Sequence, residues 1–369
     1  MAWRQLLLSR SGLLPLCAAT GGSLLAARSI ARCSDADASA ASPSIQAYSY
    51  SDGHQRRAPR MVIGDPDEFA RKMKKFAKDG ADQLLVIADF DRTLTPYYKQ
   101  RSDPKTPLQQ ESSSHGLLMT SSVLQPQVCA GEQELFARFY PVEMSPTLSA
   151  EEKLPFMVQW WNSAHALLVE YKLTKGQVQE AVALGSLSFR QGFHPLFKLL
   201  HDQHVPTLIF SAGLYDVIHA ALEQEFAAER KRNGEAEGGD DDRASTPSNV
   251  HVVSNMMRFD ADGVIEGFDG ALIHSLNKSA RVLLDSPFWQ SCELEKRRNV
   301  LLLGDSRGDV HMAEGLHADE IIRVGFLNVH VDEALDEYLD LYDVVFTHDA
   351  SLVPVQMLLE QMTAATKQQ

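Results

Sequence analysis

The strongest constraint on the fold is a series of short apolar runs that recur along the chain. The first is Leu84–Ala88, rich in β-branched residues and closed abruptly by Asp89. Similar runs follow at 207–210, 250–253, 300–303, 321–324 and 344–346. Runs of this length and composition are typical of strands that are buried on both faces of a parallel sheet.

Segments with helical periodicity separate most of these runs. They lie at 66–79, 194–203, 214–229, 278–286, 307–316 and 332–340. In the first segment, Phe69, Met73 and Phe76 recur at helical spacing. Strands that alternate with helices predict an α/β domain built on a doubly wound parallel sheet.

A long, mostly helical segment separates the first apolar run from the second. Its best helical patterns lie at 125–140, 149–171 and 174–184. Helices inserted after the first strand would form a cap over the carboxyl ends of the strands, where ligands bind in such folds. We therefore assign 66–98 and 186–369 to the core and 99–185 to a helical cap.

Composition excludes several classes of protein. The 369 residues carry 35 basic and 49 acidic side chains, a net charge of -14, which makes a general nucleic-acid binder a poor interpretation. The four cysteines are too few and too scattered for a disulfide framework or a zinc site. We expect a protein of a reducing compartment, with no nucleic-acid or membrane partner, and a monomer.

The N-terminal segment has a different composition from the rest. Residues 1–34 are rich in arginine and contain no acidic residue, as in organelle transit peptides. A secretory signal, a disordered extension and a wrongly chosen start codon are the alternatives. We interpret 35–65 as a disordered linker and the acidic segment 231–248 as a mobile surface loop.

Two carboxylates follow the first strand. Asp89 stands at the strand end, and Asp91 follows two residues later. Such a pair suits a nucleophile and a separate acid/base, and Thr93 could fix Asp91 by a hydrogen bond. An ordinary acidic turn is the alternative, which the preceding apolar run makes less favourable.

Three further elements follow the same pattern. Ser211, with the N–H groups of Ala212 and Gly213, could bind phosphate oxygens, although a helix N-cap is the alternative. Lys278 opens a predicted helix and by itself would be a surface lysine. Asp305 and Asp309 follow another strand and suit a hard divalent cation, with helix capping as the alternative.

Together these elements can converge in one crevice, because each falls at the predicted end of a different strand. Their order and chemistry resemble the haloacid dehalogenase superfamily of phosphohydrolases. Asp91 favours phosphoryl transfer over dehalogenation. The resemblance implies a haloacid dehalogenase-like core with an inserted α-helical cap.

The resemblance narrows over about residues 66 to 360, where the chain is similar to the eukaryotic pyrimidine 5'-nucleotidases, also called cytosolic 5'-nucleotidase type III. The similar segments include ADFDRTLT, FSAGLYDVI, LIHSLNK and LLGDSRGDVHMAEG. This resemblance implies that Asp89 is the nucleophile and Asp91 the general acid/base. It further implies a set of Mg²⁺ ligands and phosphate contacts. The implied ligands are Asp89, Asp305 and the Asp91 carbonyl, supported by Asp309, and the implied phosphate contacts are Ser211, Ala212 and Lys278.

The resemblance also implies residues that recognise the base. Glu143 matches the base-recognising glutamate, and Ala164 stands where the pyrimidine enzyme has serine. Together with Trp161, Ala164 makes the chain more similar to the relative that acts on 7-methylguanosine monophosphate, whose cationic base an indole face attracts. Core packing is the alternative for Trp160, and His115 aligns only loosely with a residue near the base.

The segment 259–268 contains Asp262-Gly263 and is interpreted as a hairpin rather than a calcium loop. The resemblance implies a magnesium-dependent phosphatase of nucleoside 5'-monophosphates. A phosphatase of another small phosphoester, such as phosphoserine, and a non-catalytic nucleotide-binding protein are the alternatives. The family resemblance implies a cytoplasmic location, whereas the composition of the N-terminal segment favours a mitochondrion or plastid.

Overall fold

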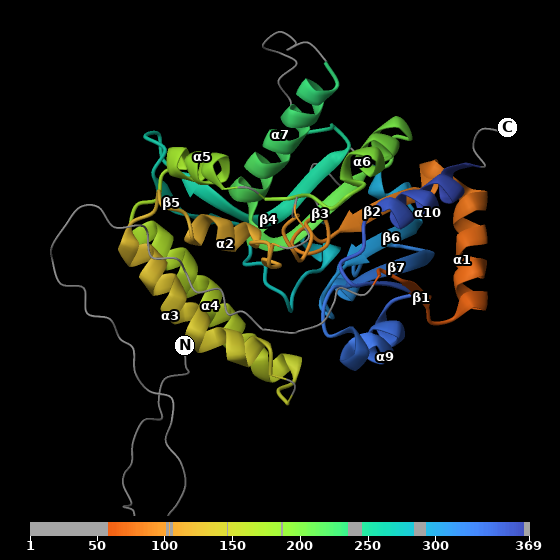
Figure 1. Ribbon diagram of the computed structural model, residues 1–369, viewed down its shortest axis with the longest axis horizontal. Helices are drawn as coiled ribbons and strands as arrows, with labels where there is room; N and C mark the ends of the chain where they lie inside the picture. Colours follow the sequence, from red (N-terminus) through yellow and green to blue (C-terminus); the bar gives the residue numbers. More distant parts are fainter. Residues whose placement is uncertain are drawn as a thin grey trace, which may run out of the picture. The chain divides into compact units, whose positions relative to one another are not determined.

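The computed structural model describes residues 58–364 except 101–102, 104–105, 146, 186, 235–245 and 284–292. Its centre is an eight-stranded sheet in the order β1-β8-β7-β6-β2-β3-β4-β5 (Figure 1). The strands are β1 (Met61–Ile63), β2 (Leu84–Ala88), β3 (Thr207–Leu214), β4 (Val250–Phe259), β5 (Ile265–Asp269), β6 (Asn299–Gly304), β7 (Glu320–Leu327) and β8 (Val344–Thr347). The leader expected at 1–34 lies outside the described residues.

The six inner strands are parallel, as the apolar runs predict. The two edge strands are antiparallel to their neighbours, β1 to β8 and β5 to β4. β5 forms the predicted hairpin with β4, and Gly263 in the turn has a φ of 77° that favours glycine. Of the linker expected at 35–65, the described residues 61–63 instead form β1 and pair with β8, and 35–57 lie outside the described residues. Three residues are too few to show a strand pattern.

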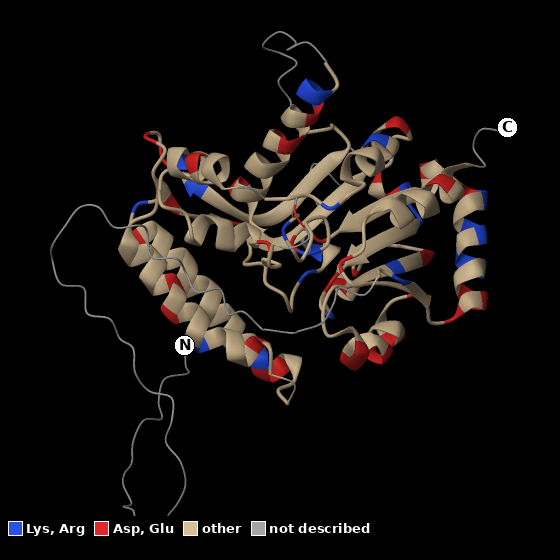
Figure 2. Ribbon diagram, in the orientation of Figure 1, with Lys and Arg blue, Asp and Glu red and all other residues tan. Residues whose placement is uncertain are grey.

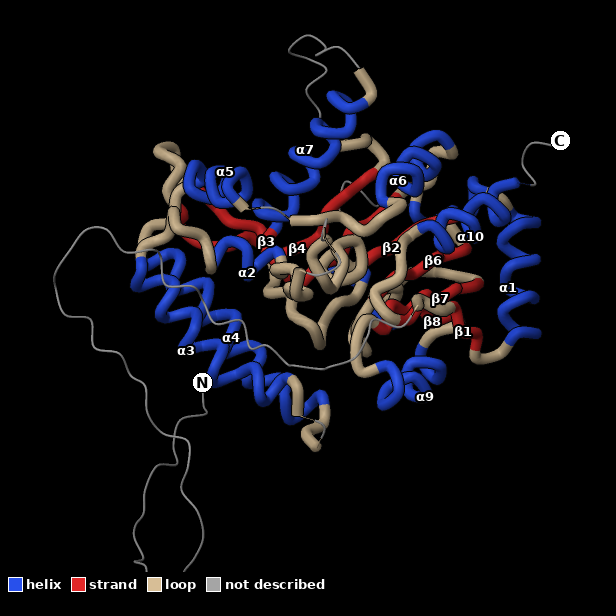
Figure 3. The backbone as a smooth tube through the Cα atoms, in the orientation of Figure 1, coloured by secondary structure: helices blue, strands red, loops and turns tan. Residues whose placement is uncertain are grey.

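Helices cover both faces of the sheet (Figure 3). Alternate residues of β2 enter different apolar cores, with Leu84, Val86 and Ala88 in one and Leu85 and Ile87 in the other. Four helices pack on the first face, α1 (Pro66–Asp79), α6 (Phe193–Asp202), α7 (Tyr215–Arg232) and α10 (Val353–Thr363). On the second face, α9 (Val331–Leu341) is apolar towards the sheet and acidic outward (Figure 2).

Four helices lie in the described part of 99–185, the segment predicted for the cap. They are α2 (Ser114–Met119), α3 (Pro126–Glu143), α4 (Ala150–Glu170) and α5 (Lys175–Leu184). α3 and α4 pack side by side (Figure 1), and Trp160 of α4 stacks on Phe139 of α3. This contact is consistent with the packing interpretation for Trp160. Among the described residues, no helix is both long and apolar enough to cross a bilayer.

One helix expected from the sequence is wrong in kind. Only a 3-10 turn, η5 (Asp309–His311), forms within 307–316. A Cβ on Gly308 would lie 2.1 Å from the Ser275 carbonyl oxygen, so Gly308 allows the two loops to pack closely. Gly315 has a φ of 95°, which suits a turn that favours glycine. Of the helix expected at 278–286, the described residues form the 3-10 helix η3 (Ala280–Leu283), and 284–286 lie outside the described residues. The segment expected to be a loop at 231–248 begins as the end of α7, and 235–245 lie outside the described residues.

Candidate active site

Three carboxylates meet at the carboxyl edge of the sheet. Asp89 directly follows β2 and Asp305 directly follows its neighbour β6, so the parallel pairing brings both to one edge. Asp309 joins them from η5. One carboxylate oxygen from each residue lies within 4.8 Å of the other two. Carboxylate oxygens at this spacing are the ligands that hard divalent cations prefer, so the group fits a metal ion of that class.

Lys278 lies among these carboxylates. Its ammonium donates to Asp89 Oδ1 and, at 2.8 Å, to Asp309 Oδ1. It comes from the loop between β5 and η3, not from a strand end as expected. Burial opposes its charge, but Asp309 and Asp89 outweigh burial and raise the pKa of Lys278. The lysine is therefore held charged at the centre of the group.

The carboxylates are costly to ionise together. Burial first, and then the charges of Asp309 and Asp305, raise the pKa of Asp89 well above its ordinary value, against the opposing effect of Lys278. Burial and Asp309 raise the pKa of Asp305 to about 7. One ammonium among three acids leaves an excess of negative charge, which a bound cation would neutralise.

The turn that carries Asp305 and Asp309 is tightly built. Asp309 Oδ2 accepts hydrogen bonds from the backbone N–H groups of Asp305 and Ser306 at 3.1 and 2.9 Å. A Cβ on Gly304 would lie 2.4 Å from Asp309 Cβ, so this strand end requires glycine. Asp309 thus orders the turn besides facing Lys278.

Two tyrosines, one in α9 and one directly after it, hold the same turn. Tyr338 donates to the Asp305 carbonyl at 2.6 Å, and Tyr342 donates to the Ser306 carbonyl at 2.5 Å. Sequence analysis did not identify either tyrosine. Tyr338 lies in α9, and Tyr342 is the residue that ends the helix. Their spacing of four residues, which would put both on one face of a helix, was the only available signal.

Asp91 is held by a residue of the inserted segment. Its two carboxylate oxygens accept from the N–H and the Oγ–H of Ser114, at 2.6 and 2.8 Å. Burial raises the pKa of Asp91, and the two Ser114 hydrogen bonds act in the opposite direction. The expected Thr93–Asp91 hydrogen bond is wrong, because Ser114 supplies the donors instead. Among the described residues, the buried Thr93 Oγ1 has no hydrogen-bond partner.

Arg190 anchors the turn after Asp91. Its guanidinium donates to the carbonyl oxygens of Thr93 and Arg92 and, at 2.9 Å, to the carboxylate of Asp349. Arg92 has a φ of 64°, which a side-chain-bearing residue rarely adopts without such support. Sequence analysis missed Arg190, and no local pattern distinguishes it from a surface arginine.

Ser211 lies in β3, next to β2. Ile209 of β3 is level with Ala88, so Ser211 lies just beyond the same edge as Asp89. The Gly213 N–H was expected to be free for a phosphate oxygen. Instead it donates to Ser211 Oγ at 3.0 Å. Ala212 is half-buried, and its carbonyl accepts from Asn255 at 2.8 Å.

The residues expected to recognise a base lie on α3 and α4. Glu143, the last residue of α3, accepts from Ser275 Oγ at 3.0 Å, three residues before Lys278. Trp161 is half-buried and meets the ring of His115 edge to face at a centroid distance of 5.2 Å. Ala164 is only 1% exposed, so it is covered in this conformation.

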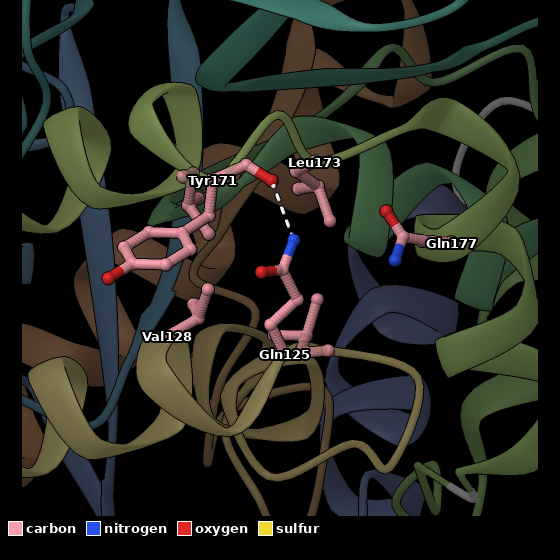
Figure 4. Close-up of a pocket in the computed structure, with 7 residues that line it drawn as sticks. Gln125, Val128, Tyr171, Leu173 and Gln177 are labelled. Carbon is pink, nitrogen blue, oxygen red and sulfur yellow. Dashed lines mark hydrogen bonds between the residues drawn. The ribbon is translucent and has the colours of Figure 1, made fainter.

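A small cavity lies between α3, α4 and α5 (Figure 4). Its volume is about 10 Å³, and Gln125 spans it with a hydrogen bond to the Tyr171 carbonyl. That space suits roughly one water molecule, and none of the expected site residues lines the cavity. It is therefore not the candidate active site.

Comparison with known proteins places the chain in a family. The family model described as "Pyrimidine 5'-nucleotidase (UMPH-1)" matches residues 105–233 and 241–363, which include Glu143, Ser211, Lys278 and Asp305. The 7-methylguanosine phosphate-specific 5'-nucleotidase of Mus musculus is 36% identical over 304 residues, covering 82% of this chain and 92% of the mouse protein. The Homo sapiens protein of that name is 35% identical, with the same coverage.

A solved structure agrees with these matches. The crystal structure of cytosolic 5'-nucleotidase IIIB bound to cytidine superimposes with a TM-score of 0.70 at 27% identity, covering 84% of this chain and 95% of that chain. The expected haloacid dehalogenase-like fold is thus confirmed. The chain belongs to the pyrimidine 5'-nucleotidase family and is a hydrolase of the haloacid dehalogenase superfamily.

Proposed function

We propose that the protein is a magnesium-dependent 5'-nucleotidase that converts nucleoside 5'-monophosphates to nucleoside and phosphate through a phosphorylated Asp89. One observation carries the proposal: Asp89, Asp305 and Asp309 converge within 4.8 Å around the Lys278 ammonium. This set supplies a nucleophile, carboxylates that can bind a metal ion and an ammonium group that can bind phosphate, all in one place.

The residues of the chain divide the work as follows. Lys278 and Ser211, with the Ala212 N–H, bind the phosphate oxygens, and Asp89 attacks phosphorus. Asp91, whose pKa burial raises, donates a proton to the departing 5'-oxygen and afterwards takes one from the attacking water. Asp89, Asp305 and the Asp91 carbonyl, with Asp309 in support, would hold Mg²⁺, which would supply positive charge beside the phosphate.

Charge explains why the cation is required. A dianionic phosphate must approach a site that already contains several carboxylates. A pair of unit charges about 4 Å apart interacts by roughly 4 kcal/mol at an effective dielectric constant near 20. The single Lys278 ammonium cannot offset that repulsion, so substrate binding itself depends on the metal.

Glu143, Trp161 and Ala164 form the proposed base site. Relatives named for 7-methylguanosine phosphate favour that nucleotide, and the cytidine in the related crystal structure favours cytidine monophosphate as a second substrate. The Trp161 indole face would attract a cationic 7-methylguanine by about 0.5–2 kcal/mol, and Glu143 would accept from the base N–H edge.

A substrate panel tests the proposal. Phosphate release is measured from cytidine, uridine, 7-methylguanosine and other nucleoside 5'-monophosphates and from phosphoserine, with Mg²⁺ and with EDTA. We expect Mg²⁺-dependent release from at least one of the three named nucleotides. Release from phosphoserine alone, from no substrate, or equally well in EDTA would contradict it.

We further propose that the protein is a cytoplasmic monomer. The location of the full-length protein in cells and its mass in solution would test this.

A further inference from the structure

Ser114 binds Asp91 through two separate groups. The Ser114 N–H donates to Asp91 Oδ1 and the Ser114 hydroxyl donates to Asp91 Oδ2, so one residue engages both oxygens of the carboxylate. Ser114 is completely buried, and 23 residues separate it from Asp91 along the chain. A carboxylate held at both oxygens cannot turn about its last side-chain bond without breaking a charge-assisted hydrogen bond.

Gly213 makes room for this contact. A Cβ at Gly213 would lie 2.2 Å from Ser114 Oγ, so only a residue without a side chain allows the serine to sit there. Gly213 itself is tied to Ser211, which accepts its N–H at 3.0 Å. Ser114 thus lies between the turn that carries Asp91 and the strand that carries Ser211.

Ser113, the residue before Ser114, has a different role. Ser113 is the N-cap of α2, and its hydroxyl accepts from the Gly116 N–H at 3.0 Å. Ser114 is the first residue of the helix, where the backbone N–H has no partner within the helix. The helix therefore leaves both donors of Ser114 available to Asp91, whereas Ser113 alone stabilises the helix start.

We propose that Ser114 is a positioning residue for Asp91, which it holds in the orientation from which the carboxyl protonates the leaving 5'-oxygen. The inference rests on the proposed acid/base role of Asp91. It adds that a residue of the inserted helical segment, not of the core, completes the catalytic geometry. Orientation of a general acid matters because proton transfer requires hydrogen-bond distance and alignment to the leaving oxygen.

The test compares S114A with the matched variant S113A. Initial rates are measured with the nucleotide that the wild-type enzyme hydrolyses fastest and with p-nitrophenyl phosphate, whose leaving group departs without a proton. For S114A we expect kcat for the nucleotide to fall by about 10- to 100-fold with KM changed by less than about twofold. The fall in kcat/KM for p-nitrophenyl phosphate should be much smaller. S113A should leave kcat for the nucleotide within about threefold of wild type.

Several outcomes overturn the inference. An unchanged kcat for S114A with the nucleotide would remove the positioning role. Equal losses with both substrates, together with a lowered melting temperature like that of S113A, would make Ser114 purely structural. D91N separates this failure from failure of the proposed function. If D91N retains wild-type nucleotide turnover, or the wild type releases no phosphate from any nucleotide, the acid/base assignment itself is wrong.

Discussion

The Lys278 ammonium lies 2.8 Å from the carboxylate of Asp309, a residue that also orders the turn behind Asp305. The same ammonium pairs with Asp89, so one cation joins a loop after the β4–β5 hairpin to the end of β2 and to the turn after β6. Removing either acid would leave Lys278 with less compensation in a buried place. The site is therefore a single electrostatic unit rather than a set of independent residues.

Asp89→Asn should abolish turnover. The amide is a poor nucleophile and cannot form the acyl phosphate, so phosphate release should fall by about 10³-fold or more. Circular dichroism should show an intact fold. Asp319→Asn is the control, since Asp319 pairs with Arg298 on the surface, and it should retain wild-type rates. Ordinary turnover by D89N would remove the nucleophile from the mechanism.

Mg²⁺ should raise the melting temperature of the wild-type protein without any substrate. A ligand that binds only the folded state stabilises it in proportion to the logarithm of its concentration over its Kd. Asp305→Asn should weaken this Mg²⁺-dependent shift, because one of the converging carboxylates is lost. Differential scanning fluorimetry with a Mg²⁺ titration and an EDTA blank measures it. An identical shift in D305N would place the metal elsewhere.

Trp161→Ala should reduce kcat/KM for 7-methylguanosine monophosphate more than for cytidine monophosphate. The reason is that only the former base is cationic, and a cation above an indole gains about 0.5–2 kcal/mol. Trp160→Ala is the matched control: Trp160 packs on Phe139 and Phe136, so it should lower stability and affect both nucleotides alike. Equal losses in W161A would assign Trp161 to packing.

Arg190→Ala should destabilise the fold strongly. The exposed fractions of the Arg190 and Asp349 side chains are both 2%, and breaking such a buried pair costs about 3–5 kcal/mol. The exposed pair of Arg298 and Asp319 provides the contrast, since R298A should change the free energy of unfolding by no more than about 1 kcal/mol. Urea denaturation of both variants measures the difference. Similar losses would mean that Arg190 does not anchor the turn.

Acid should destabilise the protein through His165. Burial, and to a smaller extent the charge of His115, lower the pKa of His165 from 6.5 to about 4. Between these values the unfolded chain takes up a proton that the folded protein does not, so stability falls as pH decreases from 6.5 to 4. His165→Phe, which can keep the stacking on Phe268, should flatten this slope in urea denaturation measured across that range. An unchanged slope would assign the acid sensitivity to other groups.

Local patterns in the sequence predicted many of the strands and helices of the fold. The helix at 66–79 and the strand at 84–88 form at the predicted bounds, because periodicity and turn residues act over neighbouring positions. Asp89 and Asp305 were identified for the same reason: an acid directly after a buried strand stands at the carboxyl edge wherever the strand goes. The similarity of whole segments to one family added the proposed base site, which no local rule supplies.

Tertiary packing decided the rest. Ser114 rather than Thr93 holds Asp91, and Arg190 and Tyr338 brace the turns that carry the acids, across separations of 23 residues or more. The turn at 307–316 replaces an expected helix because Gly308 packs directly on another loop. The sequence alone thus determined which side chains could do the chemistry, since strand ends are local. Only the folded chain decided which partners orient them, because those contacts join segments that no local pattern relates.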